Sequence, residues 1–317
     1  MKQKIFIIFL LLFLQVINTF GLPTYNSTTR SKSMGNAFTS VSKDIEAIYY
    51  NPAGIGNVAG LEIFGGYTSL YPGVISSSIL NTAISFPIWV IDDKTVISVV
   101  GLSFTGFYLK DLGEDEEMLG TITFNAGKLK FIRQFGFKDI LLGIQFGIRS
   151  LQYKIDDYVI NDIFENKKGK TIYPINAGLI SDLIIPGLKI GFVVKNILMQ
   201  DFTIISTSDK QLPYMSLGLS YNLNLKMINI LTSIDGVYDN NKQYINSGIE
   251  FAFNKVIFLQ SGVSFGLNKS FVYTFGTGIK LNINDYKFIL ETGGEIVPQL
   301  LDISGIQTYN ISIKITL

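Results

Sequence analysis

The stretch YNISIKITL, Tyr309–Leu317, alternates without a break between apolar and polar residues. Successive side chains of a β-strand point to opposite faces, so this period of two predicts a strand with one apolar and one polar face. The same alternation recurs at 215–222, 259–266 and 271–282, where the second face carries mostly small or polar residues. These segments predict an all-β protein.

Two architectures can accommodate strands of this kind. A soluble sandwich buries the apolar face against a second sheet, whereas a transmembrane barrel turns that face to lipid and its polar face to the lumen. The strand number favours the barrel, because single-chain outer-membrane barrels have an even number of antiparallel strands. The pattern predicts about fourteen strands, near 61–69, 74–87, 95–108, 119–134, 140–153, 172–183, 187–195, 212–222, 228–238, 244–253, 256–265, 271–283, 286–294 and 304–317.

The predicted connections also differ in length between the two ends of the strands. Those after the third, fifth, seventh and thirteenth strands are long, whereas Asn254-Lys255 and Asn284-Asp285 are tight turns. Long loops at one end and short turns at the other are typical of an outer-membrane barrel. The sequence therefore predicts a transmembrane β-barrel over 61–317.

Composition narrows the class of protein further. The 317 residues include 26 basic and 25 acidic ones, a balance that gives no electrostatic reason to expect a nucleic-acid partner. The chain has no cysteine, which excludes disulfides and lipid attachment through cysteine. It is rich in aromatic residues and glycine, with 16 tyrosines, 24 phenylalanines and 30 glycines, as a barrel with an aromatic outer face would be.

The N-terminal segment predicts export. Lys2 and Lys4 precede an apolar run at 5–17, and Thr19-Phe20-Gly21 supplies small residues for cleavage, so 1–21 is interpreted as a secretory signal peptide. A retained N-terminal anchor is the alternative. Together with the barrel, the signal places the protein in the outer membrane of a didermic bacterium, with the lipid bilayer as its first partner.

The absence of histidine and cysteine argues against an enzyme. Without histidine there is no Ser-His-Asp or Cys-His arrangement and no imidazole ligand for zinc. The acidic run 114–117 lacks the spacing of a calcium loop and is interpreted as a surface loop. We therefore expect no catalytic residue, no metal site and no cofactor.

Charged residues on the polar faces of strands are candidates for lining the lumen. The alternation points Arg149, Glu250, Lys280 and Glu291 inward. Such charges either line a polar path or pair with one another and fill the interior, and the sequence does not choose between the two.

A non-strand segment, SMGNAFTSVSKDIEAIYYNPAGI (Ser33–Ile55), precedes the first strand. Asp44 can cap a short helix running to Tyr49, and Asn51 can cap a second turn because proline suits a first helical position. Backbone of this kind is not tolerated against lipid but can lie inside a barrel. We therefore expect a part-helical plug, here called the hatch, over 22–60.

The same stretch resembles the N-terminal signature of the PorV/PorQ and UPF0164 families, relatives of the FadL long-chain fatty-acid transporters. The segments VKNILMQDFTIISTSDKQLPYMSLGLSY (194–221) and INSGIEFAFNKVIFLQSGVSFG (245–266) are similar to later parts of these families. The resemblance implies a fourteen-stranded barrel closed from the periplasmic side by the hatch. It also implies that Asn51, Pro52, Ala53 and Gly54 belong to that hatch.

Two functions remain open from the sequence. The first is a channel that transports or binds a hydrophobic small molecule and is opened by a shift of the hatch. The second is a PorV-type scaffold that transports nothing and holds a protein of a secretion machine.

Overall fold

A computed structural model describes residues 28–70, 77–92, 95–109, 114–130, 137–154, 169–200, 213–239, 241–267, 270–297 and 308–317. The predicted signal peptide, 1–21, and the first residues of the predicted hatch, 22–27, lie outside these residues. The strands are β1 (Glu62–Leu70), β2 (Ser77–Asp92), β3 (Thr95–Leu109), β4 (Glu114–Lys130), β5 (Phe137–Lys154), β6 (Gly169–Ile172), β7 (Ile175–Leu183), β8 (Leu188–Lys195), β9 (Tyr214–Asn224), β10 (Ile228–Asp239), β11 (Lys242–Phe253), β12 (Ile257–Gly266), β13 (Ser270–Ile283), β14 (Tyr286–Ile296) and β15 (Thr308–Thr316).

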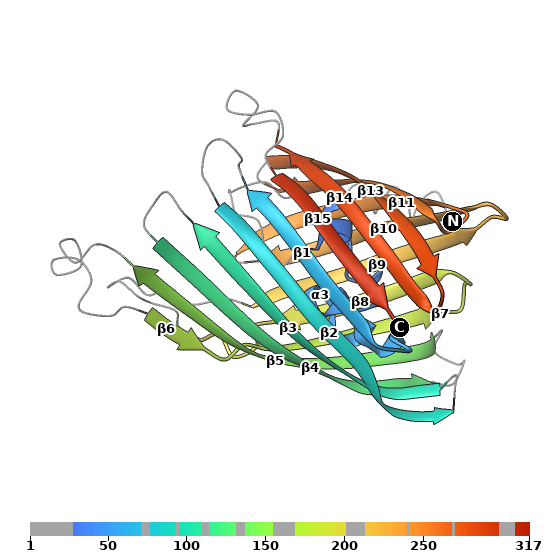
Figure 1. Ribbon diagram of the computed structural model, residues 1–317, viewed down its shortest axis with the longest axis horizontal. Helices are drawn as coiled ribbons and strands as arrows, with labels where there is room; N and C mark the ends of the chain where they lie inside the picture. The colour runs from blue at the N-terminus through green and yellow to red at the C-terminus, as the bar shows by residue number, and fades with distance from the viewer. Residues whose placement is uncertain are drawn as a thin grey trace, which may run out of the picture.

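The strands form one closed antiparallel sheet (Figure 1). Neighbours in sequence pair with each other, β1 pairs with β15, and the β4–β5 pairing closes the ring. Both β6 and β7 pair with β5, so they are one strand interrupted at Tyr173-Pro174, and the fifteen strands occupy fourteen positions. Proline cannot donate to the ladder, which accounts for the interruption. The predicted fourteen-stranded barrel is confirmed.

The outer face of the barrel is apolar and carries aromatic residues near both of its edges. In β15, Ile311 and Ile313 are exposed while Asn310 and Ser312 are buried, so the alternation faces as predicted. Exposed tyrosines lie towards the loop ends of the strands at Tyr67, Tyr273 and Tyr309, and towards the turn ends at Tyr221 and Tyr286. Two such girdles around an apolar band mark the two membrane interfaces.

This facing predicts a depth-dependent penalty for arginine. Phe275 is exposed near the middle of β13, so Phe275→Arg should destabilise the membrane-inserted barrel by about 2 to 4 kcal/mol. Leu281 points to the same side near the turn end, where Leu281→Arg should cost no more than about 1 kcal/mol. Refolding into lipid vesicles measures both variants, and equal penalties would contradict the assigned band.

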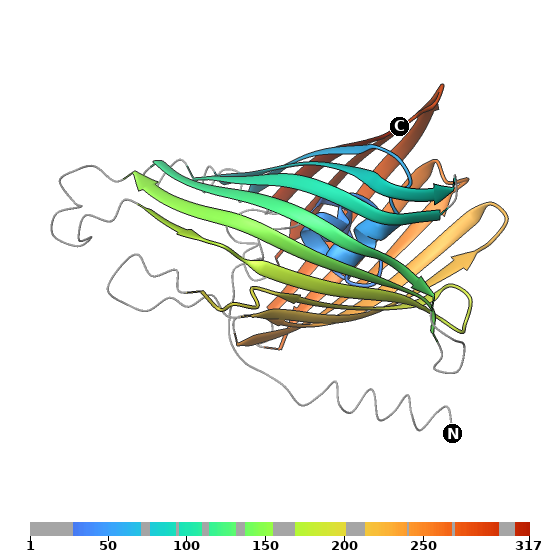
Figure 2. The same ribbon diagram turned by 90° about the horizontal axis from the view of Figure 1, so that it is seen from below.

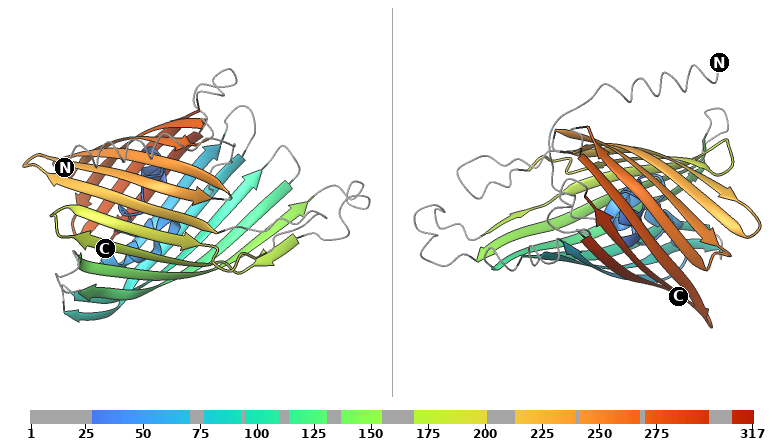
Figure 3. Two further views of the ribbon diagram at one scale, coloured as in Figure 1. Left: turned by 180° about the vertical axis from the view of Figure 1, so that it is seen from behind. Right: turned by 90° about the horizontal axis from the view of Figure 1, so that it is seen from above.

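The described part of the hatch, 28–60, lies inside the ring of strands (Figures 1, 2 and 3). It contains α2 (Thr29–Ser33), α3 (Ala47–Tyr50) and the 3₁₀ helix η1 (Pro52–Asn57), and no helix of the described residues is long and apolar enough to cross a membrane. It contacts Gly262 and Gly276, which lie near the midpoints of β12 and β13. The hatch therefore reaches from the turn ends of β1 and β15, where Glu62 accepts from the Ile45 N–H, to mid-height of the lumen.

Three details differ from the sequence-based expectations. The acidic run Glu114–Glu117 is part of β4, paired with β5, and not a loop. Because β4 begins at Glu114, only 110–113 connect it to β3, so the third connection is short. Helix α3 begins at Ala47, later than predicted, because the turn before it is closed by hydrogen bonds between residues three apart, such as Ala47 N–H to the Asp44 carbonyl. Asp44 still accepts from the Glu46 backbone N–H, as predicted for a cap, and its carboxylate also pairs with Lys314.

Candidate functional site

The contact between the hatch and the lumen wall is the candidate functional site. One part of this contact is apolar. Ile48 and Ile55 of the hatch belong to a buried cluster with Phe64, Ala83 and Val99 of β1, β2 and β3. A smaller cluster joins Ala53 to Leu141 and Ile180 of β5 and β7. Burial of these side chains, which lie away from both water and lipid, stabilises the closed lumen.

Asn51 fixes the second half of the hatch. Its side-chain oxygen caps η1 by accepting from the Ala53 N–H at 3.1 Å. Its amide donates to the carbonyl oxygens of Thr39, Leu179 and Phe192 at 2.9, 3.1 and 3.3 Å. One buried amide thus joins two parts of the hatch to β7 and β8, and Pro52 sets the first turn of η1.

Two wall residues hold the end of α3. Gln145 donates to the Ile48 carbonyl at 2.7 Å, and Lys195 donates to the Tyr49 carbonyl at 2.7 Å. The Lys195 ammonium also lies over the rings of Tyr50 and Tyr214. A cation is favourable at a helix C-terminus, where carbonyl groups lack partners within the helix.

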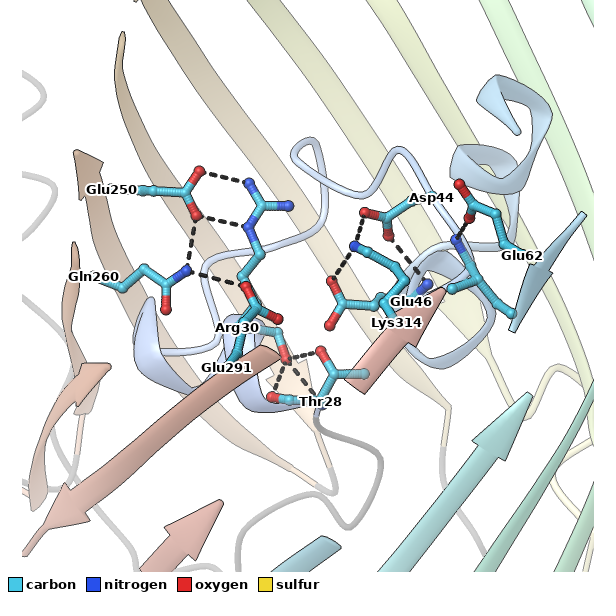
Figure 4. A network of polar contacts seen from close by, with 11 residues as sticks. Thr28, Arg30, Asp44, Glu46, Glu62, Glu250, Gln260, Glu291 and Lys314 are labelled. Carbon is cyan, nitrogen blue, oxygen red and sulfur yellow. Dashed lines mark hydrogen bonds and ion pairs between the residues drawn. The ribbon is translucent and has the colours of Figure 1, made fainter. Parts of the chain in front are cut away.

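A buried ion pair fixes the first half of the hatch (Figure 4). Arg30 of α2 donates to both carboxylate oxygens of Glu250, with Nε at 2.7 Å and a terminal nitrogen at 2.8 Å. Gln260 donates to Glu250 at 2.9 Å and to Glu291 at 3.4 Å. Two-point binding of this kind fixes orientation as well as position. It ties α2 to β11, β12 and β14.

A second ionic group lies nearer β15 and β1 (Figure 4). The Lys314 ammonium pairs with Asp44 and lies 3.6 Å from the Glu46 carboxylate. Glu62 accepts from the Ile45 backbone N–H at 2.8 Å. In β10, one oxygen of Asp235 accepts from the backbone N–H groups of Phe38 and Thr39, each at 2.8 Å. The hatch is thus held by charged groups from β10 round to β1.

Paired glycines let the hatch backbone approach the wall. Four glycine pairs are directly opposed across neighbouring strands, namely Gly143–Gly178, Gly191–Gly218, Gly248–Gly262 and Gly276–Gly293. A Cβ at any of these eight positions would lie closer than 3.0 Å to a hatch residue. The Gly276–Gly293 pair faces Ser33, and the Gly248–Gly262 pair faces Met34 and Gly35. The Gly191–Gly218 pair faces Thr39, and the Gly143–Gly178 pair faces Asn51 and Pro52. We call these four pairs the glycine seat.

The pKa values of two carboxyl groups of the hatch are shifted in opposite directions. Burial raises the pKa of Glu46 above its usual value, and the nearby Asp44 charge adds to the shift although Lys314 opposes it. For Asp44, burial acts in the same direction, but the Lys314 and Arg30 cations outweigh it and lower the pKa. Ionised Glu46 therefore weakens the seated hatch, whereas ionised Asp44 strengthens it.

This contrast predicts opposite effects of two similar substitutions. The stability associated with Glu46 is complete below its ordinary pKa of 4.5 and is lost as pH rises through the raised value, so Glu46→Gln should stabilise the hatch at neutral pH. Ionised Asp44 contributes stability at pH values above its ordinary pKa of 3.8, and this stability is lost as pH falls through the lowered pKa. Asp44→Asn should therefore destabilise the hatch at neutral pH. The temperature at which the folded gel band disappears, measured from acidic to neutral pH, tests both. Changes of the same sign would contradict the charge assignment.

The predicted site residues fall into three groups. Asn51, Pro52, Ala53 and Gly54 are buried in the hatch, and Gly54 packs against the Ser42 carbonyl. Glu250 and Glu291 belong to the buried network, whereas Lys280 is half-buried nearer the turn end of β13. The side chain of Arg149 lies outside what the structure describes.

Several residues that hold the hatch were missed from sequence. They are Arg30, Lys195, Asp235 and Lys314. Lys314 and Asp235 stand at inward positions of regular alternation, so the same period would have found them. Arg30 carries no such signal, because it precedes the segment that drew attention to the hatch.

Comparisons with known proteins identify the fold. No family model matches the chain, and no curated protein matches its sequence. Among solved structures, the monoaromatic hydrocarbon channel CymD is 9% identical with a TM-score of 0.56, covering 91% of this chain and 96% of that one. A FadL homologue of Pseudomonas aeruginosa is 12% identical with a TM-score of 0.51, covering 94% and 99%. The chain has a FadL-type outer-membrane barrel fold. At these identities the similarity concerns the fold alone.

Proposed function

We propose that this protein is a non-enzymatic outer-membrane channel that transports or binds a hydrophobic small molecule. The observation that carries the proposal is a folded plug with its own apolar contacts at mid-height of the barrel. A lumen filled in this way is closed to water, and a shift of the plug is the simplest way to open it. Two solved barrels of this fold are described as a FadL homologue and a monoaromatic hydrocarbon channel, which supports the proposed substrate class.

We also propose membership of the PorV/PorQ and UPF0164 families. The support is the Asn51-Pro52-Ala53 signature, whose asparagine caps η1 and bonds to β7 and β8. Export through the signal peptide 1–21 belongs to the same proposal. Cell fractionation with gel migration before and after boiling tests both export and barrel assembly, and a protein recovered from the cytosol would refute them.

Uptake of labelled hydrophobic compounds tests the channel directly. Vesicles containing the purified protein should take up a labelled aromatic hydrocarbon or fatty acid faster than empty vesicles. Vesicles containing Asn51→Ala should differ from the wild type, because this change removes the cap of η1 and three hydrogen bonds from the hatch. Rates equal to those of empty vesicles for the whole panel would refute the proposal.

One observation favours the PorV-type scaffold as the second candidate. The hatch is fixed on nearly every side by buried ion pairs, hydrogen bonds from side-chain amides and the glycine seat, as expected for a permanently closed barrel. Affinity purification from gently solubilised membranes, with an unrelated outer-membrane barrel as control, should then recover a stoichiometric partner. Recovery of the barrel alone together with measurable uptake would favour the channel.

A further inference from the structure

The wall around the hatch is strongly acidic. Among the wall side chains that the structure describes as buried, five are carboxylic acids and one is a base, Lys314. The acids are Glu62, Asp235, Glu250, Glu291 and Glu295. The belt therefore has four more acidic than basic groups, and it becomes strongly negative when these acids ionise in contact with water. Buried charges are screened by salt much less than exposed ones, so the belt sets the potential in the middle of the lumen.

The hatch supplies cations to this belt. Arg30 binds Glu250 through two hydrogen bonds, and Lys32 lies 3.7 Å from Glu295. Both cations come from α2, which has no acidic residue in its first turn. Two acids of the belt are therefore met by cations of the hatch, while its one described base, Lys314, is met by the hatch carboxylates Asp44 and Glu46.

Some buried oxygen atoms of the described wall residues have no hydrogen-bond donor. One oxygen of Asp235 and the side-chain oxygen of Gln260 are buried and accept no hydrogen bond among the described residues. A buried acceptor without a donor is unfavourable, and a hydrated cation supplies the missing donors. The wall is thus suited to cations both in net charge and in its free acceptors.

Charged side chains nearer the ends of the strands are less buried and include bases as well as acids. Asp182 and Lys189 pair at 3.1 Å near the turns, with each side chain about a third exposed. Lys280 is half-buried, and Lys195 is engaged by the Tyr49 carbonyl. Solvent and salt screen the exposed groups, so they affect a permeating ion less than the buried belt does.

We propose that the lumen of this barrel is a cation-selective path, and that Arg30 and Lys32 act as its built-in counterions while the hatch is seated. When α2 leaves, Glu250 and Glu295 lose these partners and attract cations from solution. Rings of acidic side chains make channels selective for cations on the same physical basis. The inference depends on the hatch being the closure but not on uptake of a hydrophobic molecule.

The test measures the reversal potential across a planar bilayer separating two KCl concentrations. Gly276→Ala, which would bring a Cβ to 2.6 Å from the Ser33 Cβ, displaces α2 in the full-length chain. Its current should reverse at the potential expected for K⁺ preference. Adding Glu250→Gln and Glu291→Gln should shift the reversal potential towards zero. The control Asp182→Asn removes one charge outside the belt and should leave the reversal potential unchanged.

Preference for Cl⁻, no preference, or no current from a folded Gly276→Ala barrel would each overturn the proposal. If Gly276→Ala does not assemble, Arg30→Ala offers a second way to release α2. Brief openings of the wild-type protein at high voltage give the same measurement without a substitution. Uptake of labelled hydrophobic compounds is measured separately, so a cation-selective barrel without such uptake would refute the proposed function and keep this inference.

Discussion

Gly276→Ala is expected to unseat α2 and make the closed barrel leaky. The new methyl carbon would lie 2.6 Å from the Ser33 Cβ and even closer to the Ser33 hydroxyl, so one of the two segments must move. Overpacking of this size costs about 1 to 3 kcal/mol, and the short α2 can shift more easily than a strand bonded on both sides. Increased conductance in planar bilayers and increased sensitivity of cells to bulky antibiotics measure the effect.

Ser33→Gly provides a matched rescue for this variant. It removes both Ser33 side-chain atoms that the new methyl carbon would meet, so the double variant should close again. Gly262→Ala should not be rescued by Ser33→Gly, because its methyl carbon would meet backbone atoms of Met34 and Gly35. Gly236 has open space around it, so Gly236→Ala should behave as wild type. If Gly276→Ala and Gly236→Ala conduct equally, the glycine seat does not position the hatch.

The barrel could be predicted from the sequence because its strands alternate regularly between apolar and small or polar residues. Lipid selects apolar residues on one face of every strand, and a lumen selects small or polar ones on the other, so β15 and β13 alternate almost without error. Tight turns mark the strand ends where Asn254, Lys255 and Asn284 adopt positive φ. The beginning of β4 was harder to place, because its first residues, Glu114–Glu117, are acidic and resemble a loop.

The site was predictable only in part, because its residues meet through the curvature of the barrel. The existence of the hatch and the capping role of Asn51 follow from local sequence. The partner of Arg30 does not, because Glu250 lies 220 residues later and several inward acids had equal claims. The glycine seat was missed for a related reason. A glycine on the polar face of a strand does not indicate its partner in the sequence, and the structure packs hatch residues against these glycines.

Loss of Arg30 is expected to destabilise the hatch far more than the loss of a partly exposed charge destabilises the barrel. Arg30→Ala leaves Glu250 buried, 3% exposed, without its cation, and Gln260 alone remains as a donor to it. Breaking one side of a buried ion pair costs about 3 to 5 kcal/mol, because the remaining charge is neither solvated nor paired. Protease should then cleave the 28–46 segment in folded barrels at a rate far above that of the wild type.

A double substitution distinguishes the loss of the ion pair from the cost of leaving Glu250 buried and unpaired. Arg30→Met with Glu250→Leu removes both charges and keeps side chains of similar size, so much of the lost stability should return. Lys189→Ala breaks the partly exposed pair with Asp182 and should cost no more than about 1 kcal/mol, because solvent replaces the lost partner. If the double substitution were as damaging as Arg30→Ala, Arg30 would hold α2 through its packing against Phe38, whose ring centroid lies 5.3 Å away, and the ion pair would contribute little.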